Sequence, residues 1–236
     1  MAADEEARVS GPPSLRIAVL VSGHGRGSNL QAILDACACG KIRGSVEIVI
    51  GTRHTAPALE RARTHGVPTL VVSPKKYGAD DEAYGRALLR TLSARGVGLV
   101  CLAGYMRKLP SVVVEAYPGR IMNIHPALLP LFGGRGMFGE RVHQAVLESG
   151  MKVSGCTVHF VDAEYDTGPI IIQRCVPVLD EDTPQTLAAR ILPEEHRAYV
   201  QAVSLFAEGR LQIEGRRVHV LAPAEPAERP VGSLGD

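Results

Sequence analysis

Two polar side chains with the chemistry of acyl transfer, Asn123 and His125, lie two positions apart just before Pro126. In an extended chain, residues i and i+2 point to the same face, so we expect the two side chains to converge. Pro126 restricts His125 to an extended backbone. A carboxamide donor beside an imidazole that titrates near neutrality could stabilise an oxyanion and move protons. From the spacing alone, a histidine that caps a turn is an equal alternative.

A carboxylate that could serve this pair is Asp166, in the segment 164–169, where Gly168 and Pro169 follow it. Asp-x-Gly-Pro is typical of an ordinary turn, and on sequence alone that interpretation is the stronger one. If Asp166 lies near His125, its charge would raise the pKa of the imidazole and keep the ring cationic. The spacing does not decide whether the two meet.

A glycine-rich segment, residues 22–30, follows the first apolar run and ends in Ser28 and Asn29. Glycines allow close backbone approach, and a helix N-terminus favours an anion, so we predict a phosphate site at this loop. Gly23, Gly25 and Gly27 also loosely match the dinucleotide fingerprint, which requires an acidic residue about 20 positions later. The second apolar run instead ends in residues 51–54, Gly-Thr-Arg-His. This disfavours NAD and leaves an NADP- or nucleotide-binding module as the alternative.

Apolar runs alternate with amphipathic stretches over residues 17–124. The runs that predict strands are 17–21, 46–50, 69–72, 97–103 and 120–124, and the stretches that predict helices are 30–37, 57–64, 81–95 and 110–117. Such alternation indicates an α/β fold with a single open, mostly parallel, Rossmann-like sheet and helices on both faces.

After residue 150 the pattern changes to two adjacent strands, 152–161 and 169–178, which predict an antiparallel edge. A helical pattern over 183–209, kinked or interrupted at Pro193, and a hairpin about Gly215 complete the expected domain, residues 15–221. We expect the acidic, Pro-bearing segment 1–14 and the Pro, Ala and Glu-rich segment 222–236 to be disordered tails.

The composition excludes several classes of protein. The 236 residues carry a formal charge of +1 and only 4% aromatic residues, which argues against a nucleic-acid binder. The longest stretch without a charged residue has 14 residues, too few to span a bilayer. Five cysteines, an odd number, predict buried, reduced thiols in a cytoplasmic protein, and a lone Cys37-x-Cys39 is a weak metal signal, so we expect no metal.

Five ordered motifs over residues 15–220 resemble the folate-dependent formyltransferase family. They are 22–23 with 27–30 (Ser-Gly, Gly-Ser-Asn-Leu), 102–107 (Leu-Ala-Gly-Tyr-Met-Arg), 123–130 (Asn-Ile-His-Pro-Ala-Leu-Leu-Pro), 158–161 (Val-His-Phe-Val) and 166–169 (Asp-Thr-Gly-Pro). The resemblance implies direct formyl transfer from 10-formyltetrahydrofolate, as co-substrate, to the amine of phosphoribosylglycinamide. Its alternative within the family is another amine, such as that of an amino sugar.

The resemblance also implies roles for particular residues. Catalysis would rest on Asn123, His125 and Asp166. Substrate would contact Gly27, Ser28, Asn29 and Glu195, and the folate would contact Met106, Arg107, Lys108, Leu109 and Asn123. The expected partners are therefore small molecules, with no nucleic acid and no membrane, and the protein is expected to be a monomer or homodimer.

Two features depart from the family pattern. An arginine that contacts folate in some members would fall near Asp81 and is absent, so Lys75 or Lys76 is a candidate to take its place. In addition, the segment 131–139 and the helix after it separate His125 from Asp166 by 41 positions, more than in one well-known form of the enzyme. The conformation of that segment is not predicted.

Overall fold

The computed structural model describes residues 14–23 and 25–223. The predicted tails, 1–14 and 222–236, lie outside this range except for their innermost residues, and His24 of the glycine-rich loop lies outside it as well. The described chain forms one seven-stranded sheet and one separate two-stranded sheet.

The large sheet has the order β3-β2-β1-β4-β5-β6-β7. β1 to β5 pair in parallel, whereas β5 with β6 and β6 with β7 pair antiparallel. The strands are β1 Leu15–Val21, β2 Gly44–Gly51, β3 Thr69–Val71, β4 Leu99–Leu102, β5 Ile121–His125, β6 Val153–Phe160 and β7 Ile170–Pro177. The predicted mostly parallel sheet with an antiparallel edge is confirmed.

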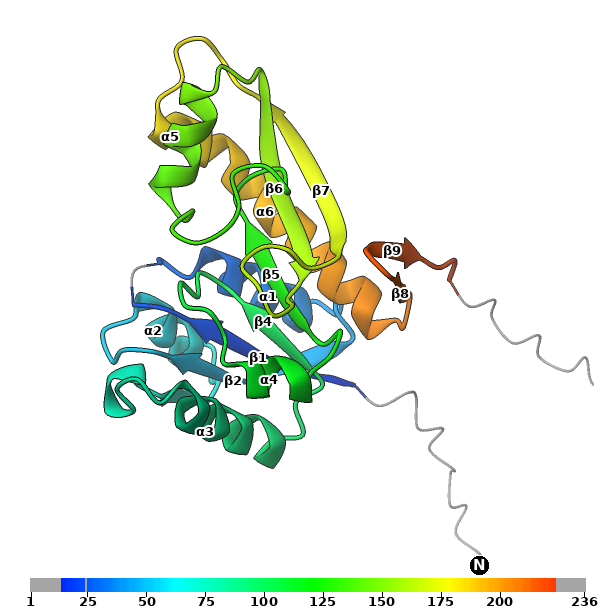
Figure 1. Cartoon of the computed structure of the whole chain (residues 1–236). Coiled ribbons are helices and arrows are strands. Elements are labelled where there is room, and N and C mark those ends of the chain that lie inside the picture. The colour runs from blue at the N-terminus through cyan, green and yellow to red at the C-terminus, as the bar shows by residue number, and fades with distance from the viewer. Residues whose placement is uncertain (1–13, 24, 224–236) are drawn as a thin grey trace, which may run out of the picture.

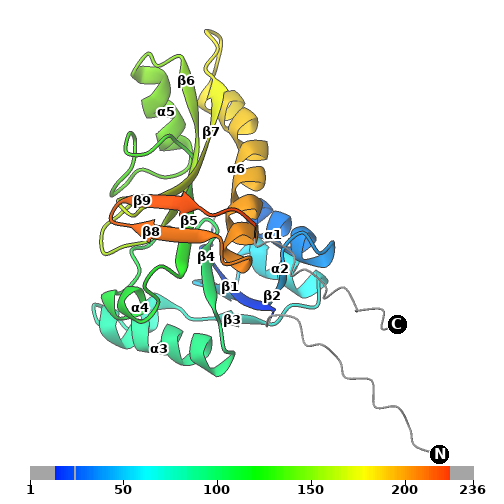
Figure 2. The same cartoon turned by 90° about the vertical axis from the view of Figure 1, so that its right-hand side faces the viewer.

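Helices cover both faces of the sheet, as predicted (Figures 1 and 2). They are α1 Ser28–Ala38, α2 Pro57–Thr64, α3 Asp81–Ala94, α4 Ser111–Ala116, α5 Glu140–Glu148 and α6 Pro184–Ala207. Alternate residues of β1 face opposite cores: Ile17 and Val19 pack with α1, α2 and α6, whereas Ala18 and Leu20 pack with α3 and α4. Residues 17–21 of β1 are buried on both faces, so this part of the strand forms an unbroken apolar run.

The chain reverses its direction of winding at β1, since β2 and β3 lie on one side of it and β4 and β5 on the other. Ligands of open α/β sheets bind at such a switch point, outside the carboxyl ends of the strands. Here Ser22 follows β1, and its backbone N–H donates to the carbonyl of Gly104, which follows β4 (3.1 Å). The buried hydroxyl of Tyr199 from α6 lies within 3.1 Å of the Leu102 carbonyl and 2.9 Å of the Met122 carbonyl, next to the same edge.

The long helix α6 continues through Pro193, so of the two predicted outcomes, a kink or an interruption, the interruption is wrong. Pro193 is exposed, and the solvent-facing side of a helix tolerates its missing N–H better than a buried side. Thr183 and Thr186 form a reciprocal capping box that fixes the start of the helix. Beyond α6, β8 Leu211–Glu214 and β9 Arg217–Val220 form the predicted hairpin around Gly215, separate from the main sheet (Figure 2).

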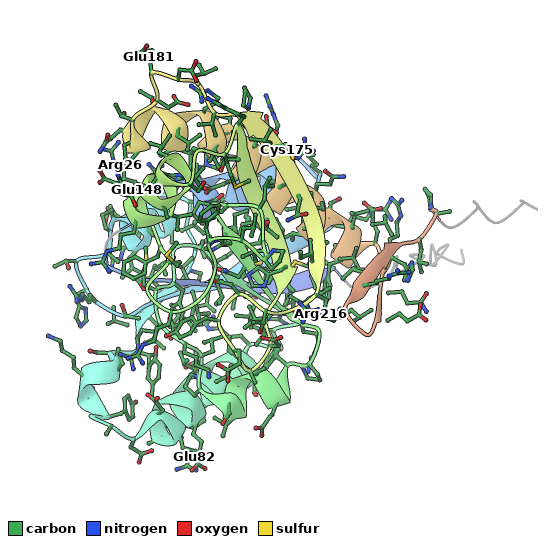
Figure 3. The ribbon with its side chains drawn as sticks, turned by 45° about the horizontal axis from the view of Figure 1, so that its top comes forward. Arg26, Glu82, Glu148, Cys175, Glu181 and Arg216 are labelled. Carbon is green, nitrogen blue, oxygen red and sulfur yellow. The ribbon has the colours of Figure 1, made fainter. Side chains whose placement is uncertain are left out.

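The five cysteines are free thiols, but they are not all buried as predicted. Cys101 and Cys156 are buried in the sheet, Cys37 is half-buried, and Cys39 and Cys175 are exposed. Cys175 lies on β7, the outer strand of the sheet (Figure 3). Because a strand alternates between its two faces, an apolar run on an edge strand does not bury every member.

Candidate active site

A cleft of about 610 Å³ opens at the carboxyl ends of β4 and β5. The residues predicted to act in catalysis or binding that line it are Asn29, Met106, Arg107, Lys108, Leu109, Asn123, His125, Asp166 and Glu195. They come from α1, β5, α6 and two loops, so the fold brings together segments that are far apart in the sequence. Gly27 and Ser28 do not line the cleft themselves; they adjoin Asn29 at the start of α1.

Asn123 and His125 lie on the same face of β5 and are held by the next strand. In the antiparallel register, Asn123 lies opposite His159 and His125 lies opposite Thr157 on β6. The buried Thr157 hydroxyl donates to the Ala127 carbonyl (2.6 Å) and accepts from the Leu129 backbone N–H (3.0 Å). The turn that follows His125 is therefore fixed from β6.

Asp166 reaches both residues of this pair. Its Oδ2 lies 3.6 Å from His125 Nδ1, and its Oδ1 lies 3.5 Å from Asn123 Nδ2. The same Oδ2 accepts a hydrogen bond from the Gly134 backbone N–H (2.9 Å), which ties the segment 131–139 to the site. Asp166 has a positive φ of 57°, a conformation that Asp tolerates better than most residues. The sequence left the meeting of Asp166 and His125 open, and the fold supplies it.

The loop that carries Asp166 approaches β6 closely because of Gly168. A Cβ at position 168 would lie 1.9 Å from the Phe160 carbonyl oxygen, far inside van der Waals contact. Pro169 follows, and its carbonyl accepts from the Phe160 backbone N–H (2.9 Å). The Gly-Pro pair therefore fixes the distance between this loop and the strand that faces Asn123.

The charge state of His125 differs from the prediction. Burial lowers the pKa of His125, and this effect outweighs the opposing effects of the Asp166 carboxylate and the Phe132 carbonyl. His125 is only 3% exposed, and its Nε2–H donates to the Phe132 carbonyl (2.8 Å). Asp166 thus does not keep the ring cationic at neutral pH; it limits how far burial depresses the pKa. The pKa of Asp166 itself lies below its usual range: burial raises it, but contacts with His159, His125 and the Gly134 N–H outweigh that effect.

Asn29 and Glu195 meet at one end of the cleft although 166 positions separate them. Asn29 Nδ2 donates to Glu195 Oε2 (2.8 Å). Burial raises the pKa of Glu195, and the hydrogen bond from Asn29 only partly offsets it. Asn29 Oδ1 is buried without a hydrogen-bond partner. This pair therefore offers a polar donor–acceptor set that a bound molecule could satisfy.

The start of α1 depends on Gly27 rather than on a side-chain cap. Gly27 is the N-cap with a positive φ of 75°, and a Cβ there would lie 2.8 Å from Ala58 Cβ of α2. Ser28 and Asn29 do not cap the helix with their side chains, because both residues are inside it. The first N–H groups of a helix lack intrahelical acceptors, so the loop retains the anion-binding potential predicted for it.

The segment 106–109 forms one wall of the cleft and is anchored at both ends. Ser22 Oγ accepts from the Met106 backbone N–H (2.8 Å), and the Tyr165 hydroxyl accepts from the Lys108 backbone N–H (2.9 Å). Lys108 Nζ also pairs with Glu164 (3.1 Å) across the cleft mouth. The wall is thus tied to the loop that carries Asp166.

Comparison with known proteins identifies the family of this site. The family model described as formyl transferase matches residues 15–203, which include the cleft residues from Asn29 to Glu195. The chain belongs to the formyl transferase family.

Proteins of the family match most of this chain in sequence, and one solved structure matches it in fold. The chain is 44% identical over 201 residues to the chloroplastic phosphoribosylglycinamide formyltransferase of Arabidopsis thaliana, covering 85% of this chain and 68% of that one. It is 41% identical over 199 residues to the phosphoribosylglycinamide formyltransferase of Escherichia coli K12, covering 84% and 90% of the two chains. The solved glycinamide ribonucleotide transformylase 1 of Symbiobacterium toebii shares 54% identity and a TM-score of 0.83, covering 88% of this chain and 94% of that one.

The lysines predicted to replace the missing folate-contacting arginine are not part of the cleft lining. Lys75 and Lys76 do not line the cleft; Lys76 lines a separate hollow next to β3 and α3. The cationic side chains that do line it are Arg107, Lys108 and Arg135. Arg107 pairs with Asp81 (3.4 Å), the position near which the missing arginine was expected.

Several cleft residues were not predicted as site residues. His143 of α5 is buried with Nδ1 unpartnered, and burial, together with nearby His125, lowers its pKa. His159, Tyr105 and Tyr165 also line the cleft. His159 belongs to one of the motifs on which the family resemblance rests. It lies two positions after Thr157, on the same face of the strand, and this spacing could have marked it as a site residue. His143 had no comparable signal, because only the fold brings it from α5 into the cleft near His125.

Two kinds of feature are absent from the described residues. No helix within residues 14–23 and 25–223 combines the length and apolar character needed to cross a bilayer. In the same part of the chain, no group of three or more His, Cys, Asp or Glu side chains is arranged to hold a metal ion.

Proposed function

We propose that this protein is a phosphoribosylglycinamide formyltransferase. It transfers the formyl group of 10-formyltetrahydrofolate to the glycinamide amine, giving formylglycinamide ribonucleotide and tetrahydrofolate in de novo purine biosynthesis. The observation that carries the proposal is that the Asp166 carboxylate lies within 3.6 Å of both Asn123 Nδ2 and His125 Nδ1 in the cleft. The chain that forms this arrangement is similar to proteins of that name.

In this mechanism the amine attacks the formyl carbon directly, and the carbonyl oxygen becomes an oxyanion. Asn123 donates an N–H to that oxygen as its charge develops, in a largely buried site where such a donor is most effective. His125 enters the reaction neutral, because burial lowers its pKa. It takes up the proton lost by the amine, through water, and the imidazolium is stabilised by Asp166 (3.6 Å). The same proton then passes to the departing folate nitrogen.

The two substrates occupy different walls of the cleft in this proposal. The phosphate of phosphoribosylglycinamide binds at Gly27, Ser28 and Asn29, where helix N–H groups favour an anion. Glu195, hydrogen-bonded to Asn29 at 2.8 Å, accepts from the glycinamide portion. The folate lies along the segment 106–109, whose backbone is anchored by Ser22 and Tyr165. Asn123 contacts both substrates at the reacting carbonyl.

The test is a spectrophotometric assay of tetrahydrofolate formation. We expect tetrahydrofolate to appear only when 10-formyltetrahydrofolate and phosphoribosylglycinamide are both present. Formation with an amino-sugar nucleotide, but not with phosphoribosylglycinamide, would transfer the assignment to a sugar N-formyltransferase. NADPH binding without folate binding, measured by calorimetry, would favour the nucleotide-binding alternative. A cytoplasmic location and a monomeric or homodimeric state stay predictions; the name of the Arabidopsis relative includes chloroplastic.

A further inference from the structure

Asn123 and His159 face each other as a directly opposed pair on the antiparallel strands β5 and β6. Asn123 Nδ2 lies 3.1 Å from His159 Nε2. His159 is only 1% exposed, so no water competes freely for its ring. We propose that His159 is a positioning residue, which orients the Asn123 carboxamide so that one of its N–H groups is presented to the formyl oxygen. This inference rests on the proposed function.

The other ring nitrogen of His159 decides which nitrogen carries the proton. His159 Nδ1 lies 2.8 Å from the Phe160 carbonyl oxygen. A carbonyl oxygen only accepts hydrogen bonds, so Nδ1 must carry a proton. In the neutral ring, Nε2 then has a lone pair and no proton.

A lone pair at Nε2 determines how the Asn123 amide is turned. The amide oxygen would repel the lone pair, whereas the amide nitrogen donates to it, so Nδ2 faces the ring. One N–H is then engaged by His159. The second N–H has Asp166 Oδ1 as its neighbour at 3.5 Å, which is long for a hydrogen bond, and it remains available to a ligand oxygen.

The cationic form of His159 would reverse this arrangement. Its Nε2–H would point at Asp166 Oδ1, 3.6 Å away, or would require the Asn123 amide oxygen in place of Nδ2. The shorter contact is the one to Asn123 Nδ2, at 3.1 Å. The distances therefore favour the neutral ring as an acceptor and Asn123 as its donor.

Two substitutions separate this positioning role from simple packing. His159→Gln keeps an acceptor near the place of Nε2, whereas His159→Asn keeps only a group near the place of Nδ1. We expect His159→Asn to lower kcat by roughly 10- to 100-fold, the effect of one misdirected hydrogen bond, with both KM values changed less than about 3-fold. We expect His159→Gln to recover most of that loss. His219→Asn, on the exposed hairpin strand β9, is the matched control and should leave kcat unchanged.

An unchanged kcat in His159→Asn, an equal loss of kcat in the Asn and Gln variants, or an effect confined to KM would each overturn the proposal. Nitrogen NMR of the wild-type protein labelled with ¹⁵N-histidine gives a second measurement that needs no variant to fold and no turnover. We expect a protonated Nδ1 and an unprotonated Nε2 for His159 at neutral pH. A cationic ring or the opposite tautomer would overturn the proposal, even if formyl transfer is observed. An inactive wild-type protein with the expected ring spectrum would instead refute the proposed function.

Discussion

The carboxylate of Asp166 lies 3.6 Å from the imidazole of His125, although the two residues are 41 positions apart in the chain. The close approach depends on Gly168, which allows the Asp166 loop to pass against β6, and on Gly134, whose backbone N–H donates to Oδ2, the same carboxylate oxygen that faces His125. Asp166 therefore contacts both members of the Asn123 and His125 pair from a fixed position.

Removal of the Asn123 carboxamide is expected to affect the chemical step. Loss of one oxyanion donor costs on the order of 100- to 1000-fold in kcat, so we expect a decrease of that size in Asn123→Ala, measured by steady-state tetrahydrofolate formation. Gln144→Ala, an exposed amide on α5, is the control and should retain wild-type kcat. Near wild-type turnover in Asn123→Ala would remove Asn123 from the mechanism.

The pH dependence of kcat/KM is expected to report on His125. Because burial lowers the pKa of His125 below its ordinary value of 6.5, the neutral ring persists to mildly acidic pH and the acid limb should lie below 6.5. The Asp166 carboxylate raises this pKa, so Asp166→Asn should move the acid limb to still lower pH while also lowering kcat.

The control for this profile is Asp180→Asn, since Asp180 pairs with Lys152 on the surface and does not line the cleft. We expect its acid limb to coincide with that of the wild-type protein. A limb that moves to higher pH in Asp166→Asn would contradict the assignment of the limb to His125.

Glu195 is expected to contribute to the binding of the amine substrate. Glu195→Gln removes a half-buried charge that accepts from Asn29, and we expect the KM for phosphoribosylglycinamide to rise by about 10-fold or more, with a small change in the KM for folate. Glu194→Gln is the neighbouring control, because Glu194 pairs with Arg174 and Arg197 outside the cleft. A rise in the folate KM alone would refute this assignment.

Gly168→Ala is expected to cost both stability and activity. The added Cβ would lie 1.9 Å from the Phe160 carbonyl, so the Asp166 loop must shift away from β6. Overpacking of this kind costs roughly 1–3 kcal/mol, which corresponds to a fall in Tm of at least about 2–4 °C for a chain of this size. Gly25→Ala, whose Cβ would meet no atom within 4 Å, should leave Tm unchanged. Equal Tm and kcat in Gly168→Ala and wild type would contradict the role of the close contact.

The strands of the parallel sheet could be predicted because burial on both faces leaves a local signal. The run at 17–21 lies within β1, and the boundaries at 121–125 differ from those predicted by one residue at each end. The interior of α6 was less predictable: Pro193 suggested a kink or an interruption, but the helix continues because its packing on the sheet is supplied by other residues, such as Leu187 and Tyr199.

The arrangement of the site could be predicted only in part. The placement of Asn123 and His125 on one strand face follows from local spacing. The pairing of Asn29 with Glu195 and of Asn123 with His159 depends on contacts between distant segments, which composition and spacing do not encode. The charge state of His125 was predicted wrongly, because the burial that lowers its pKa is a property of the folded cleft.

The most direct test of the central claim is to follow the formyl carbon itself. With 10-formyltetrahydrofolate carrying ¹³C in the formyl group, we expect a single turnover to place the label on the glycinamide nitrogen, detected by NMR as a formamide carbon, with tetrahydrofolate released in equal amount. Label recovered as free formate, or no transfer to phosphoribosylglycinamide while the label reaches another amine, would contradict the account.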